Sequence, residues 1–376
     1  MTLCVFTLIA SEFLPVSLLP PIADDLRVTE GLAGQGIAIS GAFAVLTSLS
    51  IPALAGSMNR KTLLLALTAL MGISGAVIAL APNYPIYLAG RALIGVVIGG
   101  FWSMSVAVAI RLVPASSVPK ALAIFNGGNA LATVVAAPLG AWLGSVIGWR
   151  GAFWCLVPVA LLTFAWQWIG LPAMKADDRA PGSGNVFKLF RNRAVALGMG
   201  GCSLFFMGQF TLFTYVRPFL ETVTRVNVAT LSLVLLAIGV AGFIGTALIG
   251  LILKRCLYGT LVVIPILMAV VALILIPVGA WAVPVAALLA LWGLLGTSAP
   301  VGWWNWIAQA MPMSAEAGGG LMVAVIQLSI ALGSTVGGML FDASGYQSTF
   351  AASAVLLLIA ALLTFMASWS AAAKTA

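Results

Sequence analysis

Histidine is absent from this 376-residue chain, and charged side chains make up only 7% of it. Soluble domains carry about 25% charged residues, so the chain lacks most of the charge that a water-soluble surface needs. The absence of histidine excludes His-based catalysis, His proton relays and His metal ligands. Because no catalytic pair of carboxylates and no nucleophile beside a base is visible either, we predict that the protein is not an enzyme and carries no cofactor.

Cysteine is also scarce, and its pattern points away from metal binding. The four cysteines are scattered, at positions 4, 155, 202 and 256, and no two of them form a CxxC pair. Cysteines without metal-ligand spacing usually serve as small apolar residues in a protein interior. We therefore predict no metal site.

Apolar residues, in contrast, make up 62% of the chain, and the mean hydropathy is +1.16. They form continuous runs rather than the alternating pattern of a membrane β-barrel. A helix needs about 20 such residues to cross a bilayer. The sequence therefore predicts an all-α polytopic membrane protein with twelve transmembrane helices, at about residues 2–22, 34–56, 62–81, 85–110, 118–145, 150–171, 195–219, 229–252, 258–277, 283–307, 316–340 and 347–369.

The basic residues indicate how these helices are oriented. If the N-terminus lies inside the cell, twelve lysines and arginines fall on the cytoplasmic side and four on the outer side, namely Arg27, Arg150, Arg217 and Arg225. This is the positive-inside pattern, and it predicts that both termini are cytoplasmic. The net charge of +8 is then a consequence of topology and not a sign of nucleic-acid binding. Because no basic arm precedes the first apolar run, we also expect an N-terminal extension before Met1.

The chain repeats itself at an offset of about 197 residues. In this repeat Glu12 aligns with Gln209. A polar stretch, residues 172–193, lies between the two copies and is predicted to be a cytoplasmic linker. We therefore predict two pseudo-symmetric six-helix bundles, at 1–171 and 194–376. Transporters built in this way bind their substrate near the middle of the membrane, between the two halves.

Glu12 is the one acidic residue deep inside an apolar run. It lies roughly 15 Å along a helix that begins at the first residue, near the middle of a bilayer about 30 Å thick. A charge at that depth is costly, so the default interpretation is a proton or ligand site. The alternative is a carboxyl that stays protonated and bonds to a neighbouring helix. Its repeat partner Gln209 cannot titrate, so we predict that the N-terminal half handles the proton.

Arg91 is the one basic residue left within a span, about two turns from the span's start. A guanidinium has five donors and cannot be hidden without partners. We predict a role in proton coupling, with Glu12 or nearby carbonyls as partners. The alternatives are that it snorkels to the interface or only bonds to backbone carbonyls.

Several short motifs resemble those of a known family. Arg91 followed by glycines at 95, 99 and 100 resembles the fourth-helix motif of the major facilitator superfamily. Residues 56–61 resemble its loop between helices 2 and 3, although Asn59 stands where an Asp is usual. Residues 137–140 resemble the helix-5 motif of the drug:proton antiporter branch. The resemblance implies packing or conformational roles for Gly95, Gly99, Gly100, Pro138, Gly140, Arg60 and Lys61.

Further stretches look like those of the purine ribonucleoside efflux pumps, namely residues 12–19, 99–105, 111–114, 119–122, 300–303 and 324–328. That resemblance implies export of nucleosides such as inosine, driven by inward proton flow, across the bacterial inner membrane. Sugar exporters share most of the same framework, so a sugar or multidrug exporter stays open. A membrane receptor or sensor with a transporter-like body is the alternative from another class. The expected partners are a small solute, protons and the lipid bilayer, and the expected state is a monomer.

A nucleoside site would need stacking surfaces and amide partners. Aromatic rings stack on bases, and Asn or Gln can pair with purine edges through donor and acceptor atoms. The run Trp303-Trp304-Asn305-Trp306 is the densest such cluster, although tryptophans there could instead belt the membrane interface. The predicted substrate-binding residues are Trp102, Asn126, Gln209, Tyr215, Trp303, Asn305 and Gln327.

Overall fold

The computed structural model describes residues 2–55, 58–112, 114, 118–174, 191–253, 255–310 and 315–372, and all of the regular secondary structure in those ranges is helical. Ten of these helices are long and apolar enough to cross a membrane, and a bent pair at the N-terminus makes eleven. One of the ten, residues 131–170, is interrupted at Gly148, so counting its two arms separately gives twelve. The all-α polytopic architecture predicted from the sequence is confirmed.

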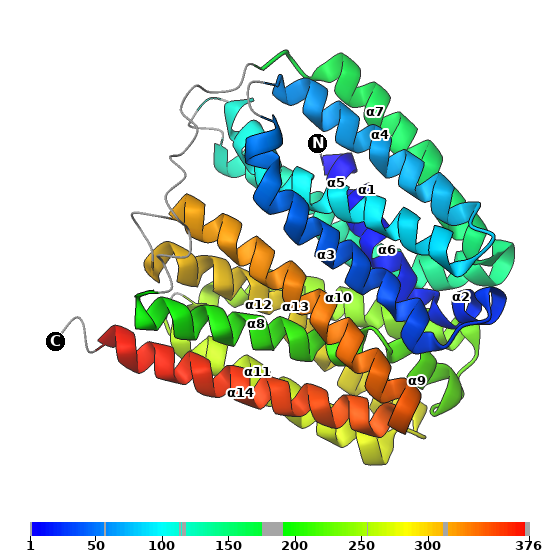
Figure 1. The fold of residues 1–376 in the computed structure, drawn as a ribbon. Helices are drawn as coiled ribbons and strands as arrows, with labels where there is room; N and C mark the ends of the chain where they lie inside the picture. The colour runs from blue at the N-terminus through cyan, green and yellow to red at the C-terminus, as the bar shows by residue number, and fades with distance from the viewer. Residues whose placement is uncertain are drawn as a thin grey trace. The chain divides into compact units, whose positions relative to one another are not determined.

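The chain divides into two compact units, residues 1–182 and 183–376. Most of the predicted linker, 172–193, lies outside the described residues. Unit 1 contains α1 (Thr2–Phe13), the 3-10 helix η1 (Leu14–Ser17), α2 (Leu19–Leu26), α3 (Glu30–Ala55), α4 (Arg60–Ala79), α5 (Tyr84–Arg111), α6 (Val118–Trp154) and α7 (Leu156–Gly170) (Figure 1). Unit 2 contains α8 (Arg193–Phe213), α9 (Val216–Thr222), α10 (Val228–Leu253), α11 (Leu257–Val278), α12 (Ala282–Ala310), α13 (Ala315–Ser344) and α14 (Tyr346–Ala372).

The first predicted span, residues 2–22, is not one straight helix. The α1–η1 segment and α2 meet at an angle of 67°. Pro15 stands near the start of η1 and Pro20 near the start of α2, as the sequence shows. Proline lacks an N–H and cannot continue an α-helical hydrogen-bond ladder, so the span breaks there. Unit 2 has a corresponding break between α8 and α9, at Thr214 and Tyr215.

Two unusual backbone conformations recur in both units. Arg27 (φ 54°) and Arg225 (φ 56°) are the two non-glycine residues with positive φ among those described, and they are 198 positions apart. Gly148 (φ 74°) and Gly345 (φ 78°) are 197 positions apart. Positive φ is costly for a residue with a Cβ atom, so its recurrence at the repeat offset indicates that the two units share local backbone geometry as well as sequence.

Glycines set the spacing between α3 and α5 in unit 1. A Cβ atom on Gly95 would overlap the carbonyl oxygen of Ser40, and one on Gly99 would overlap that of Ala44. The two helices therefore pack backbone against backbone, as small residues allow in membrane proteins. Gly100 faces another neighbour, since its Cβ would lie 2.9 Å from Leu67 Cδ2 on α4.

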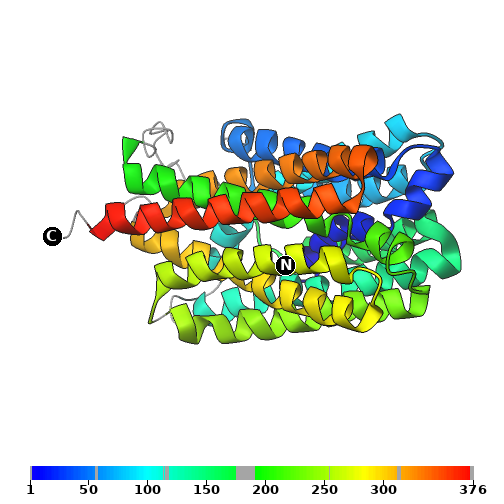
Figure 2. The ribbon, with the colours of Figure 1, turned by 90° about the horizontal axis from the view of Figure 1, so that it is seen from below.

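Glycines also allow close helix packing in unit 2. A Cβ atom on Gly293 of α12 would overlap the carbonyl oxygen of Ile238 on α10, and one on Gly245 of α10 would overlap that of Leu294. On the other side of this unit, α8 and α14 lie side by side (Figures 1 and 2). Each unit is thus assembled around closely packed helix pairs.

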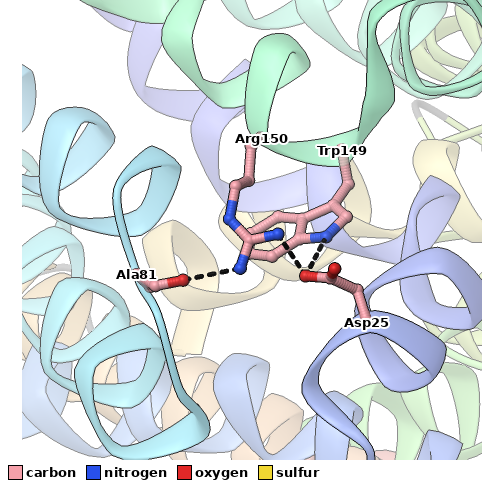
Figure 3. Close-up of polar contacts among 4 residues, drawn as sticks. All are labelled: Asp25, Ala81, Trp149 and Arg150. Carbon is pink, nitrogen blue, oxygen red and sulfur yellow. Dashed lines mark hydrogen bonds and ion pairs between the residues drawn. The ribbon is translucent and has the colours of Figure 1, made fainter.

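A polar clamp fastens one end of unit 1. Trp149 Nε1 donates to Asp25 Oδ2 at 3.2 Å, and Arg150 forms an ion pair with the same oxygen (Figure 3). The second guanidinium nitrogen of Arg150 donates to the carbonyl of Ala81 at 2.7 Å, and its Cζ lies 4.3 Å from the Trp149 ring centroid. The clamp ties α6 to α2 and to the turn between α4 and α5.

We expect Asp25→Asn to lower the free energy of unfolding by up to about 1 kcal/mol, because both charged partners in this clamp are partly exposed and such ion pairs contribute little. Asp24→Asn is the matched control, since that exposed side chain has no hydrogen bond or ion pair in the described ranges. Thermal unfolding in detergent, followed by tryptophan fluorescence, measures the difference. Equal midpoints for the two variants would contradict a role for the clamp.

Candidate functional site

Arg91 is fully buried in unit 1 and bonds to two other helices. Its Nε donates to the carbonyl of Gly36 at 3.1 Å, and one terminal nitrogen donates to Ser40 Oγ, also at 3.1 Å. The other terminal nitrogen donates to the carbonyl of Ser11 at 2.9 Å. A buried guanidinium is tolerated only when its donors are used in this way. The alternative in which Arg91 snorkels to the interface is therefore wrong, and the side chain instead joins α5 to α3 and α1.

Glu12 follows Ser11 directly and lies within electrostatic range of Arg91. Its side chain is half-buried, and it stands one residue before α1 ends at Phe13. The last carbonyls of a helix lack partners within the helix and attract cations. Arg91 meets that requirement through the Ser11 carbonyl. The structure thus brings together the two residues that the sequence singled out for proton coupling.

Tyr87 belongs to the same cluster, although the sequence analysis did not select it. It is fully buried, and its hydroxyl donates to the carbonyl of Ala33 at 3.4 Å. A Cβ atom on Gly36 would lie within 2.8 Å of three atoms of the Tyr87 ring end. The signal in the sequence was spacing, because Tyr87, Arg91 and Gly95 are four residues apart and so share one face of α5.

A seam of hydroxyl groups joins α8 to α13 in unit 2. Ser203 Oγ and Ser329 Oγ are 2.8 Å apart, and Thr214 Oγ1 and Ser334 Oγ are 3.0 Å apart. Thr211 donates to the carbonyl of Gly333 at 3.2 Å. Hydrogen bonds of this kind connect helices inside membrane proteins. Sequence reasoning missed the seam because serines and threonines in apolar helices commonly bond only to their own helix.

Tyr215, a predicted substrate residue, is already engaged by the protein. It is fully buried at the break between α8 and α9, and its hydroxyl donates to the carbonyl of Ser334 at 2.8 Å. Its ring stacks on Phe341 with the centroids 5.3 Å apart. The role of Tyr215 in substrate binding stays a prediction. In the structure its hydroxyl group adds one more hydrogen bond to the α8–α13 seam.

Unit 2 also contains buried polar atoms without a hydrogen-bond partner in the described structure. They include Gln209 Oε1 on α8, Ser232 Oγ on α10 and the indole nitrogens of Trp292 and Trp303 on α12. Trp292 was not selected from the sequence, but it is fully buried. Buried polar groups are normally satisfied, so unpartnered ones mark positions where a ligand could bind. Gln327 is buried on α13 in the same unit.

The remaining predicted substrate residues have other surroundings. Asn305 is exposed, and its Nδ2 donates to the carbonyl of Val301 at 2.8 Å, within its own helix. Trp304 is 46% exposed, as the interface-belt alternative requires. Trp102 is partly buried against the core of unit 1, edge-on to Phe101. The side chain of Asn126 lies outside the described residues.

The loop before α4 is organised by Asn59, the residue that replaces the usual Asp. Its Oδ1 accepts from the backbone N–H of Lys61 at 2.9 Å and from that of Met174 at 3.1 Å. The N–H of Arg60 in turn donates to the carbonyl of Met174 at 2.9 Å. An asparagine oxygen is as good a helix N-cap as a carboxylate, so this capping role survives the substitution.

The helix-5 motif residues lie on α6. Pro138 is inside that helix and half-buried, and Gly140 faces η1. A Cβ atom on Gly140 would overlap Ser17 Oγ and lie 2.6 Å from Leu14 Cδ1. The glycine therefore lets α6 approach the bend of the first span closely.

The family to which the chain belongs follows from comparison with known proteins. The family model described as Major Facilitator Superfamily matches residues 1–319. The fold agrees: a bacterial homologue of the human lysosomal transporter Spinster, solved in an inward-facing and unoccupied conformation, superimposes with a TM-score of 0.72. At 17% sequence identity, that alignment covers 98% of this chain and 95% of the other. The chain is a member of the Major Facilitator Superfamily, a family of membrane transporters.

Two curated relatives are more similar in sequence. "Transcription regulatory protein OpdE" of Pseudomonas aeruginosa is 70% identical over 366 residues, which is 96% of this chain and 91% of the relative. "Purine ribonucleoside efflux pump NepI" of Salmonella typhimurium is 39% identical over 359 residues, which is 96% of this chain and 90% of the relative. The resemblance to these efflux pumps that the sequence motifs indicated is confirmed.

Proposed function

We propose that this transporter exports purine ribonucleosides such as inosine across the bacterial inner membrane in exchange for protons. The observation that carries the proposal is that Glu12 lies within electrostatic range of the buried Arg91 at the end of α1, inside a span, in a chain 39% identical to a nucleoside efflux pump. A carboxyl beside a fully buried cation changes the local charge whenever it binds or releases a proton. Intramembrane acids of this kind commonly belong to proton pathways.

The proposed cycle couples that proton to the solute. Protonated Glu12 favours one conformation and bound nucleoside favours the other, so the two ligands exchange across the membrane. Each inward proton releases about 2.3 kcal/mol per 100 mV of membrane potential, in addition to any pH gradient. Gln209, Trp303 and Gln327 of unit 2 are the proposed contacts to the base, since all three are polar or aromatic groups in the interior. The protein acts as a monomer with both termini in the cytoplasm.

A second function is favoured by one observation. The relative that is 70% identical is named as a transcription regulatory protein. A transporter body that binds a solute and changes conformation could report that solute to the cell. A chain that binds inosine and alters gene expression in the cell, but moves no inosine in purified form, would favour this sensor function over export.

The test of export uses purified protein in sealed proteoliposomes. With an imposed pH gradient, we expect labelled inosine to accumulate in the compartment from which protons leave. Addition of a protonophore should abolish the accumulation, because antiport requires the gradient. Labelled lactose and a cationic dye are tested as substrates in the same assay, to represent the sugar and multidrug alternatives. Accumulation of either of those solutes in place of inosine would overturn the nucleoside assignment.

A further inference from the structure

Gly296 on α12 leaves room for the side-chain amide of Gln209 on α8. A Cβ atom at this position would lie 2.8 Å from Gln209 Nε2 and 3.4 Å from Gln209 Cδ. The same atom would lie 3.3 Å from Met268 Cε on α11, a residue that is fully buried. The amide therefore rests against the glycine backbone, and any larger residue would displace it. Since the displaced group is the end of a flexible side chain, such a substitution would move the amide without breaking the helix packing.

The side-chain amide of Gln209, which Gly296 accommodates, has an oxygen atom that no other group in the described structure engages. Gln209 Oε1 is buried and accepts no hydrogen bond from the described parts of the chain. An acceptor left in that state costs free energy, and a donor from a bound molecule would recover it. Gln209 also aligns with Glu12 in the sequence repeat, so unit 1 has a carboxyl at this position and unit 2 has a neutral amide.

We propose, building on the function proposed above, that Gly296 is a positioning residue that holds Gln209 to read one edge of the purine base. An amide presents an acceptor beside a donor. It matches the edge of a 6-oxopurine, where N1–H donates to Oε1 and O6 accepts from Nε2–H. Gly296 thereby sets specificity without touching the substrate.

The proposal makes a chemical distinction between two nucleosides of nearly the same size. Inosine has the N1–H donor, whereas 1-methylinosine carries a methyl group in its place. A site built to hydrogen-bond an N–H group rejects an analogue without it, because the buried acceptor then stays unpaired. We expect the native protein to transport inosine at least about tenfold faster than 1-methylinosine at low substrate concentration.

The experiment compares Gly296→Ala with Gly302→Ala in proteoliposomes. The control glycine is on the same helix, and its Cβ would also lie 2.8 Å from its nearest neighbour, but that neighbour is Leu261 Cδ2, an apolar side-chain end. Gly296→Ala should reduce the preference for inosine to less than threefold, and Gly302→Ala should retain the native preference. Gln209→Met removes the amide while keeping the side-chain length, and it should lose the preference even if Gly296→Ala folds poorly.

The outcomes separate this inference from the function on which it rests. If the native protein transports no inosine, the proposed function fails. If it transports inosine and 1-methylinosine equally, or if a folded Gly296→Ala keeps the native preference, the positioning role of Gly296 is overturned while nucleoside export stands.

Discussion

Replacing Arg91 with methionine is expected to lower the free energy of unfolding by about 3 kcal/mol. The substitution leaves the carbonyls of Ser11 and Gly36 and the hydroxyl of Ser40 without their donor. Each orphaned acceptor costs about 1–3 kcal/mol in a protein interior, and hydrogen bonds between membrane helices average about 0.6 kcal/mol. Relief from burying a guanidinium offsets part of the sum, because desolvating a charge is itself costly.

Unfolding by SDS in mixed micelles, followed by tryptophan fluorescence, measures this loss. Arg150→Met is the control, since it also removes an arginine from unit 1 but from a partly exposed clamp, and it should cost about 1 kcal/mol or less. Arg91→Lys should fall between the two, because a compact ammonium cannot reach three acceptors on two helices as a planar guanidinium does. Stability of Arg91→Met equal to that of Arg150→Met would show that the buried cluster does not hold α1, α3 and α5 together.

The helices were predictable because each is a long apolar run, and such a run can be recognised from the residue types of the segment alone. The bend of the first span was less accessible. Pro15, Pro20 and Pro21 are visible in the sequence, but the apolar run continues through them, so hydropathy predicted one span over residues 2–22. In the structure this span is bent by 67° between its two helical parts. Proline acts through the missing N–H and not through hydrophobicity, so a hydropathy pattern cannot register the break.

The candidate site divides in the same way. Glu12 and Arg91 could be found from the sequence because a charge within an apolar run is rare and costly. The partners of Arg91 could not, since two of the three are backbone carbonyls, which every residue possesses. The surroundings of Asn305 could not be predicted either: its residue type suggested a ligand contact, which stays a prediction, and in the structure its amide donates one turn back to the carbonyl of Val301. Which face of a helix a polar group occupies is decided by tertiary packing.

Replacing Glu12 with glutamine is expected to abolish inosine accumulation driven by a pH gradient while exchange of inosine for inosine continues. Glutamine has nearly the shape of a protonated glutamate but cannot release a proton. The variant therefore keeps the solute pathway and loses the coupling. Proton-driven accumulation should fall at least tenfold, as expected when the driving ion no longer shifts the conformational equilibrium. Inosine counterflow should stay within about twofold of the native rate.

Two further measurements make the result specific to Glu12. Counterflow by the native protein should vary with pH, whereas counterflow by Glu12→Gln should vary much less, because the titratable group at this position has been removed. Asp24→Asn, an exposed acid-to-amide change in the same bent span, should behave as the native protein in both assays. Native accumulation by Glu12→Gln would end the claim for this carboxyl, and the proton would then have to be carried by another acid of the chain. A loss of counterflow as well would assign Glu12 to the solute pathway in place of coupling.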